Sequence, residues 1–142
     1  MTIKNILIYL SSRTELPLLS KFTLELTNFY NARLFALTII PQAKTHLKTR
    51  AEEHAWRKLY ELEEDAFEAD RKISLLLEEL DKVNQKTLTS KIIEIALSYK
   101  IDLLVLPDNI KLQIPRLLKE LGIPVLIFPI SKTLKKENLN KN

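Results

Sequence analysis

The sequence contains no cysteine. This absence excludes disulfide bonds, thiol catalysis and cysteine-ligated metals, and with them zinc fingers and iron–sulfur clusters. Long apolar runs are missing as well, because the first one, Ile6 to Leu10, is shorter than the core of a signal peptide and far shorter than a membrane span. We therefore expect a cytoplasmic protein with no membrane partner.

Basic charge is in small surplus and lies mostly at one end of the chain. The net charge is +4, yet residues 132–142 alone hold four lysines against one glutamate, so the remainder is nearly neutral. No aromatic residue is interleaved with these lysines for base stacking, which argues against a nucleic-acid partner. We predict one domain over residues 1–131, followed by a disordered basic tail over residues 132–142.

Glycine occurs once, at Gly122, where it follows a predicted helix. That helix is indicated by Ile114, Leu117, Leu118 and Leu121 at spacings of three and four, with Pro115 in its first turn. Gly122 then suits a left-handed C-terminal cap.

Two apolar runs flank this helix, residues 101–106 before it and residues 125–128 after it, each ending at a proline. Runs without polar alternation are typical of strands covered on both faces, as in parallel sheets. The region from 100 to 130 therefore predicts a strand–helix–strand unit with a right-handed crossover.

The first third of the chain repeats this pattern. Residues 3–10 and 34–40 predict strands, and the helix between them is expected to begin after Thr14 and to end near Asn31 in a left-handed cap. Its buried stripe is predicted to hold Leu16, Leu19, Phe22 or Thr23, Leu26 and Phe29.

A long amphipathic helix is predicted over residues 43–70. Its alanines and leucines recur at spacings of three and four, and we expect Trp56, Tyr60 and Phe67 to be the large members of the buried stripe. The acidic residues between positions 61 and 70 are interpreted as a solvated face.

Residues 72–78 allow two interpretations. The helical spacing can be continued to about residue 83, but a helix of such length is rare in a small domain, so we predict a short strand here. A further helix is expected from Thr87, with Leu88, Ile92, Ile95 or Ala96, and Tyr99 facing inward. The predicted order is βαβαβαβαβ.

Read in this order, the chain resembles the universal stress protein family. The resemblance rests on the segments IKNILIYLSS, KIDLLVLP and GIPVLIFP, with Asp102 and Pro124 at the family's Asp and Pro positions. It implies a doubly wound, five-stranded parallel sheet of strand order 3-2-1-4-5 with helices on both faces, as in the adenine nucleotide α-hydrolase-like group. It also implies a dimer formed through the last strand.

The chain departs from the nucleotide-binding members of this family at two places. Those members carry an Asp after the first strand, where Ser11 stands here, and a glycine-containing loop after the fourth strand, where Pro107 replaces the first glycine. Residues 108–121 contain no glycine, although a phosphate loop needs glycine to turn its N–H groups toward an anion. We therefore predict that ATP is not bound in the family manner and that the protein has no cofactor.

A different ligand could still bind where the first and fourth strands end. In the implied topology this is the switch point of the sheet, the usual ligand position in such folds. The residues that would meet there are Ser11, Ser12, Arg13, Asp108, Asn109 and Lys111. A small anion or an adenine nucleotide is one interpretation, and helix caps, a turn at 108–109 and solvated basic side chains are the other.

No catalytic or metal-binding arrangement is predicted. His46 and His54 are eight residues apart, which does not stack two imidazoles on one metal ion, and no serine has a predicted histidine partner. An enzyme of the α-hydrolase-like group is a weaker alternative for the same reason. We expect a regulatory or interaction module whose partner is a second copy or another protein, with Val125, Leu126, Ile127 and Phe128 at the dimer interface.

Overall fold

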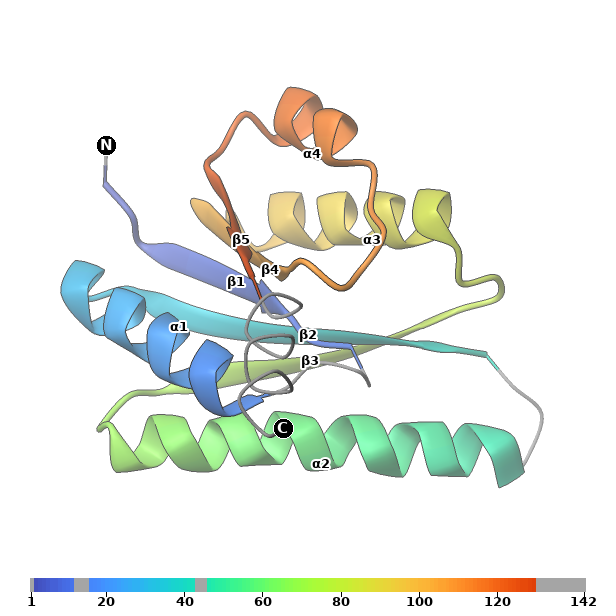
Figure 1. The fold of residues 1–142 in the computed structure, drawn as a ribbon, viewed down its shortest axis with the longest axis horizontal. Coiled ribbons are helices and arrows are strands. Elements are labelled where there is room, and N and C mark those ends of the chain that lie inside the picture. The colour runs from blue at the N-terminus through green and yellow to red at the C-terminus, as the bar shows by residue number, and fades with distance from the viewer. Residues whose placement is uncertain (1, 12–15, 43–45, 130–142) are drawn as a thin grey trace, which may run out of the picture.

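The structure, a computed structural model, describes residues 2–11, 16–42 and 46–129. Within these residues, strands and helices alternate along the whole chain (Figure 1). The strands are β1 (Asn5–Tyr9), β2 (Arg33–Pro41), β3 (Ile73–Leu80), β4 (Leu103–Pro107) and β5 (Val125–Phe128), and the helices are α1 (Leu16–Tyr30), α2 (His46–Glu68), α3 (Gln85–Ser98) and α4 (Ile114–Leu121).

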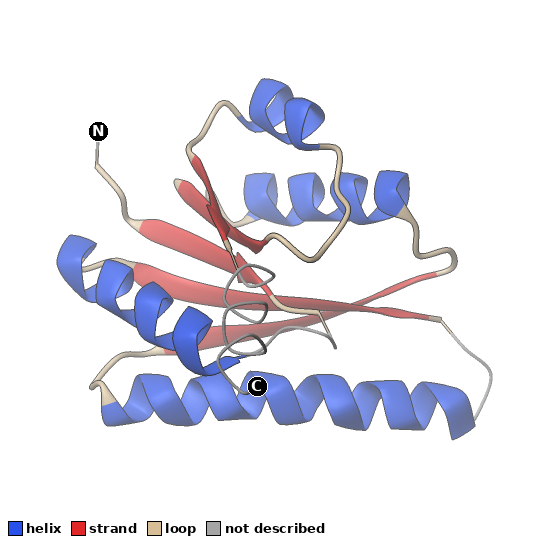
Figure 2. Ribbon diagram, viewed as in Figure 1, coloured by secondary structure: helices blue, strands red, loops and turns tan. Residues whose placement is uncertain are grey.

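The strands form one parallel sheet in the order β3-β2-β1-β4-β5, as the sequence predicts. The central strand β1 pairs with β2 on one side, Leu7 with Phe35, and with β4 on the other, Leu7 with Leu104. Figure 2 shows a helical layer on each side of the sheet, with α1 and α2 on one face and α3 and α4 on the other. Each helix therefore connects two parallel strands and covers part of one face of the sheet.

The sheet separates two hydrophobic cores. Alternate residues of β1 point to opposite faces, so Ile6 and Ile8 pack under α1 and α2 while Leu7 and Tyr9 pack under α3 and α4. This arrangement explains why the strand sequences are apolar without alternation, since both faces of the sheet are buried.

A residue with a left-handed backbone conformation follows each of the four helices that the structure describes. Asn31 and Gly122 have φ angles of 51° and 61°, as predicted for these two positions. Asp70 and Lys100 have φ angles of 57° and 54° and do the same for α2 and α3. The positive φ of Asp70 stops α2 before residue 73, so the predicted strand there is confirmed and the alternative of one continuous helix is excluded.

The helix α3 begins before Thr87, where the sequence analysis placed its start. Its N-cap is Asn84, whose side chain accepts the N–H of Thr87, while the Thr87 hydroxyl accepts the N–H of Asn84. Thr87 is thus the second member of a capping box rather than the first helical residue.

The predicted burial is wrong for Tyr60 and Phe67, whereas Trp56 is half-buried and packs against the core. In α2 the buried stripe consists of Ala55, Leu59, Leu62 and Ala66. Each residue turns a helix by about 100°, so an aromatic side chain one position after a buried residue points sideways, away from the sheet. Accordingly Tyr60 is 56% exposed, Phe67 is 82% exposed, and Trp56 is only half-buried.

Other predictions for the helices fail in the same way. Phe29, expected in the buried stripe of α1, is 80% exposed, and Tyr99 after α3 is also exposed, although its ring packs against Phe35. None of the helices in the described ranges is both long and apolar enough to cross a membrane. The predicted tail, residues 132–142, lies outside those ranges.

Candidate functional site

A hollow of about 650 Å³ opens at the carboxyl ends of β1, β2 and β4. This is the switch point of the sheet, where β1 leads to one side and β4 to the other. The hollow is bordered by residues from three strand ends, from α2 and from the start of α3, and the polar ones are Tyr9, Ser11, Thr38, His54, Lys58, Gln85, Asn109 and Lys111.

Three of the predicted site residues meet at this hollow, namely Ser11, Asn109 and Lys111. Asp108 does not border it, because the chain turns here and the backbone N–H of Asp108 donates to the carbonyl of Phe128 at 3.0 Å. Ser12 and Arg13 lie outside the described residues.

Several bordering residues were missed by the sequence analysis. His54 and Lys58 come from α2, one helical turn apart, and Gln85 comes from the start of α3. Their spacing carries no motif, and only the fold brings them to the end of β1. Thr38 could have been identified from the sequence, because it is the single hydroxyl-bearing residue in the apolar run 34–40.

Two buried hydroxyl groups give the hollow a polar floor. Thr38 is buried, and its Oγ1 atom has no hydrogen-bond partner among the described residues. Such a group costs free energy unless a ligand or water satisfies it. Burial raises the pKa of Tyr9 to about 12, so its hydroxyl stays neutral and can donate at any physiological pH.

The remaining wall of the hollow is apolar, with Ile39, Ile40, Val83, Leu88 and Ile110 on its border. A concave, mostly apolar site with a few polar groups is the usual form of a small-molecule site. The arrangement suits an organic ligand that has both apolar surface and hydrogen-bonding groups.

The segment between β4 and α4 is bonded to α3 instead of being an open loop. The Gln85 side chain donates to the carbonyl of Leu112 at 3.2 Å, and the N–H of Gln113 donates to the Thr89 hydroxyl at 3.0 Å. Arg116 extends this link by donating to Ser90 Oγ at 2.9 Å.

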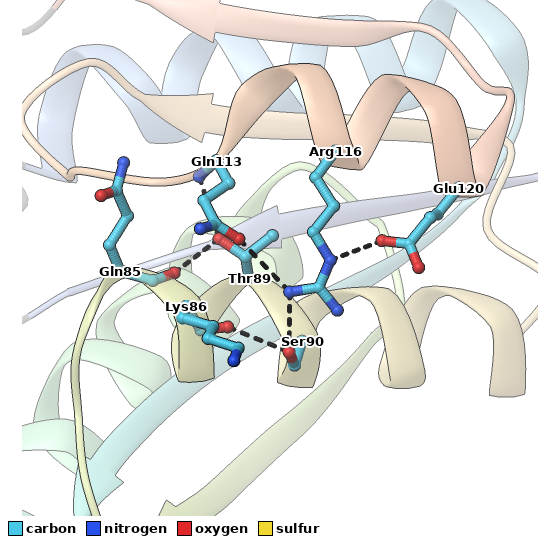
Figure 3. A network of polar contacts seen from close by, with 7 residues as sticks. All are labelled: Gln85, Lys86, Thr89, Ser90, Gln113, Arg116 and Glu120. Atoms are coloured by element: carbon cyan, nitrogen blue, oxygen red, sulfur yellow. Dashed lines mark hydrogen bonds and ion pairs between the residues drawn. The ribbon is translucent and has the colours of Figure 1, made fainter.

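Figure 3 shows how these side chains join the two helices. Arg116 lies between them and also contacts Glu120 at 2.6 Å and Gln113 Oε1 at 3.3 Å. Thr89 is fully buried, and its hydroxyl donates in turn to the carbonyl of Gln85. The backbone N–H groups of Asp108 and Gln113 are therefore both engaged within the protein, at the two ends of a segment without glycine.

Histidines and carboxylates do not converge on a metal site. Among the residues that the structure describes, no group of three or more His, Asp and Glu side chains could hold a metal ion. His54 borders the hollow, whereas the side chain of His46 is not described.

The strand β5 forms one edge of the sheet and leaves apolar side chains in contact with solvent. Ile127 is 48% exposed and Leu126 is also exposed, while Val125 and Phe128 are half-buried. Phe128 packs against Phe22 of α1 with ring centroids 5.2 Å apart. Two of the four predicted interface residues are thus half-buried and two are exposed, and Leu126 and Ile127, being consecutive in the strand, lie on opposite faces of the sheet.

Comparison with known proteins gives structural matches only, since neither a protein-family sequence model nor a curated protein matches the sequence. A universal stress protein family member from Burkholderia pseudomallei superposes with a TM-score of 0.70 at 19% identity, covering 90% of this chain and 97% of that one. A universal stress protein in complex with cAMP has a TM-score of 0.66 at 15% identity, covering 91% and 99%.

A third match is the universal stress protein from Archaeoglobus fulgidus in complex with dAMP, with a TM-score of 0.62 at 11% identity, covering 91% of this chain and all of that one. All three share the sheet and helices described above, as the sequence resemblance predicts. The chain therefore has the fold of the universal stress proteins.

Proposed function

We propose that this protein is a regulatory or interaction module of the universal stress protein type, which catalyses no reaction and does not hold ATP through a glycine loop. The observation that carries the proposal is the segment from Asp108 to Gln113. A phosphate loop must offer several free N–H groups to an anion, and glycine lets the backbone turn them outward. Here the N–H groups at both ends are already bonded, to Phe128 and to Thr89.

The partner that the proposal assigns first is a second copy, bound through β5. An edge strand with exposed apolar side chains pairs readily with another strand, and Leu126 and Ile127 are exposed on this edge. Pairing of β5 with β5 of the second copy would cover both side chains and extend the sheet across the dimer.

Sedimentation velocity of the variant Ile127→Lys tests this role. We expect the wild type to associate and the variant to lose one association step, because lysine places a charge in the apolar seam. Leu97→Lys is the matched control, since Leu97 is a similarly exposed leucine of α3, at 59%. A folded Ile127→Lys variant with the mass of the wild type would show that β5 is not the seam.

A second candidate function is supported by the hollow at the end of β1. We infer that it could hold a flat, nucleoside-like ligand, with the hydroxyls of Tyr9 and Thr38 bonding the ligand's polar edge and Lys111 at the rim. Two structures of the same fold are complexes with cAMP and dAMP. Such binding would not require the phosphate loop.

Thermal-shift titration with cAMP, dAMP and adenosine tests this candidate. A ligand at 100 times its dissociation constant stabilises the folded state by ~2.7 kcal/mol. If the hollow is the site, the shift should be saturable and should disappear in Thr38→Val, which keeps the shape of the side chain but removes its hydroxyl. A shift that survives Thr38→Val and Lys111→Ala would place the ligand elsewhere, and no shift would leave the interaction module as the sole function.

A further inference from the structure

The second edge of the sheet, β3, is protected against pairing with another strand only by the two glutamates near its end, Glu78 and Glu79. It is eight residues long, contains neither proline nor glycine, and all of its residues are half-buried. β2 pairs with its inner side, and α2 covers one face. No described strand pairs with its outer side. Natural edges of this length are usually shortened, bent or covered.

The backbone groups on this outer side can be identified. The carbonyl of Leu80 accepts the N–H of Gln42, so it points inward toward β2. Because backbone groups alternate in direction along a strand, Ile73, Leu75 and Leu77 direct their N–H and carbonyl groups outward. A strand laid against β3 would bond to these residues.

The charges along β3 are complementary to those of a second, antiparallel β3. The strand is preceded by Arg71 and Lys72 and carries Glu78 and Glu79 toward its end. A twofold axis through Leu75, perpendicular to the sheet, places Lys72 of one copy opposite Glu78 of the other. Lys72 is exposed and forms no ion pair with another described residue. Glu78 lies 3.8 Å from Lys91 Nζ of its own chain, so across the seam it would be shared between Lys91 and Lys72 of the other copy.

The same axis pairs apolar side chains between the charged ends. Ile73 of one copy lies opposite Leu77 of the other, and Leu75 lies opposite itself, all on the face covered by α2. Pairing in this register therefore satisfies backbone, charged and apolar groups together.

The exposed aromatic side of α2 borders this edge. Tyr60 and Phe67 line a hollow of about 520 Å³ together with the charged residues Glu63, Glu64, Arg71 and Lys72, and it ends at Ile73, at the beginning of β3. The opposite side of α2 faces α1, where Ser20 donates to Asp65 at 2.8 Å. The aromatic residues that the sequence analysis expected to be buried thus face the open edge of the sheet.

We propose that two copies of this chain associate through antiparallel β3 strands, with their α2 helices side by side above the seam. Strands lie ~4.8 Å apart, and α2 packs on both β2 and β3, so its axis is about 5 Å from the twofold axis. The two α2 helices would then be ~10 Å apart, which is the usual separation of packed helices. Tyr60 and Phe67 of both copies fill the space between them.

This seam is independent of the β5 seam, and four full-length proteins separate the two. At a protein concentration between the dissociation constant of the β3 seam and ten times that value, we expect the wild type to sediment as a species larger than a dimer. The single variants Ile127→Lys and Lys72→Glu should then sediment mainly as dimers, and the double variant mainly as a monomer. If Ile127→Lys alone gives a monomer, or if Lys72→Glu leaves the mass unchanged, the β3 seam is wrong. If Lys72→Glu alone gives a monomer, the association through β3 is supported and the proposed association through β5 is wrong.

A charge swap tests the register. Lys72→Glu should weaken the β3 association about tenfold, equivalent to ~1.4 kcal/mol. Adding Glu78→Lys together with Lys91→Gln should restore it, because each copy then presents the reversed pair and the new lysine does not face Lys91, whose Nζ lies 3.8 Å from Glu78 in the wild type. Failure of the swap to restore association would exclude the twofold axis through Leu75.

The aromatic contribution has a matched pair of variants. Phe67→Asp should weaken association, whereas Phe29→Asp should not, since Phe29 is equally exposed at the end of α1 but does not border the hollow at the beginning of β3. Neither side chain belongs to a core, so both variants should fold. Equal effects of the two substitutions would contradict the placement of α2 at the seam.

Discussion

The Thr89 hydroxyl accepts the backbone N–H of Gln113 at 3.0 Å, which ties the middle of α3 to the residue before α4. Gln113 is the N-cap of α4 and makes no side-chain cap bond, but its own backbone N–H is satisfied by the neighbouring helix. The bond holds the segment between β4 and α4 against α3. It is the structural basis for the proposal that this segment does not receive phosphates.

Thr89→Val should destabilise the protein by ~1–3 kcal/mol, because valine keeps the shape of the buried side chain but leaves the Gln113 N–H without its acceptor. Urea denaturation measures this loss. Ser90→Ala is the control, because it removes a hydroxyl from the same network at a partly exposed position and should cost less. If Thr89→Val unfolds at the wild-type urea concentration, the bond does not hold the segment.

Asp102→Ala should cost ~1–3 kcal/mol in unfolding free energy. The carboxylate of Asp102 accepts the N–H groups of Lys4 and Asn5 at 2.8 and 2.9 Å, and so fixes the start of the central strand to the start of β4. The melting temperature of Asp102→Ala is measured together with that of the control Asp81→Ala, which removes an exposed aspartate after β3. Equal melting temperatures for the two variants would contradict this role.

Gly122→Ala should lower stability by about 1 kcal/mol through the backbone alone. Gly122 has a φ angle of 61°, but an added Cβ would meet no atom within 4 Å. Gly122→Asn should cost less, since asparagine tolerates this conformation better. A loss well above the backbone cost in Gly122→Ala would reveal a steric contact instead.

Tyr9 should make stability fall at high pH. Burial raises its pKa from 10.0 to about 12, so the neutral form is favoured in the folded state and its contribution is complete below pH 10. As the pH rises from 10 to 12 the unfolded state ionises first, and roughly 2 kcal/mol of stability is lost. Comparing denaturation of wild type and Tyr9→Phe across this range isolates the effect, since phenylalanine cannot ionise. Parallel curves for the two proteins would contradict the burial of a neutral hydroxyl.

The sequence predicts the fold best where single residues constrain the backbone. Pro115 and Gly122 place both ends of α4, and Asn31 ends α1, because each of these residues restricts or permits particular φ angles whatever the surroundings. The start of α3 was misplaced because its capping box uses Asn84 with Thr87, a pairing that a search for a single N-cap does not reveal.

Side-chain burial and the site depend on neighbours that are remote in sequence. Periodicity locates the buried stripe of α2, but it cannot tell whether another element covers the side that carries Tyr60 and Phe67. In the same way, Ser11, Asn109 and Lys111 could be predicted from strand ends, whereas His54 and Lys58 reach the hollow only because α2 crosses over it.

Calorimetric titration with Mg²⁺-ATP, in parallel with adenosine, tests the central claim most directly. If the segment from Asp108 to Gln113 cannot receive phosphates, ATP should give no saturable heat, or should bind no more tightly than adenosine. Binding of ATP at least ten times tighter than adenosine, a phosphate contribution of ~1.4 kcal/mol or more, would show that the segment opens to receive phosphates and would contradict the account.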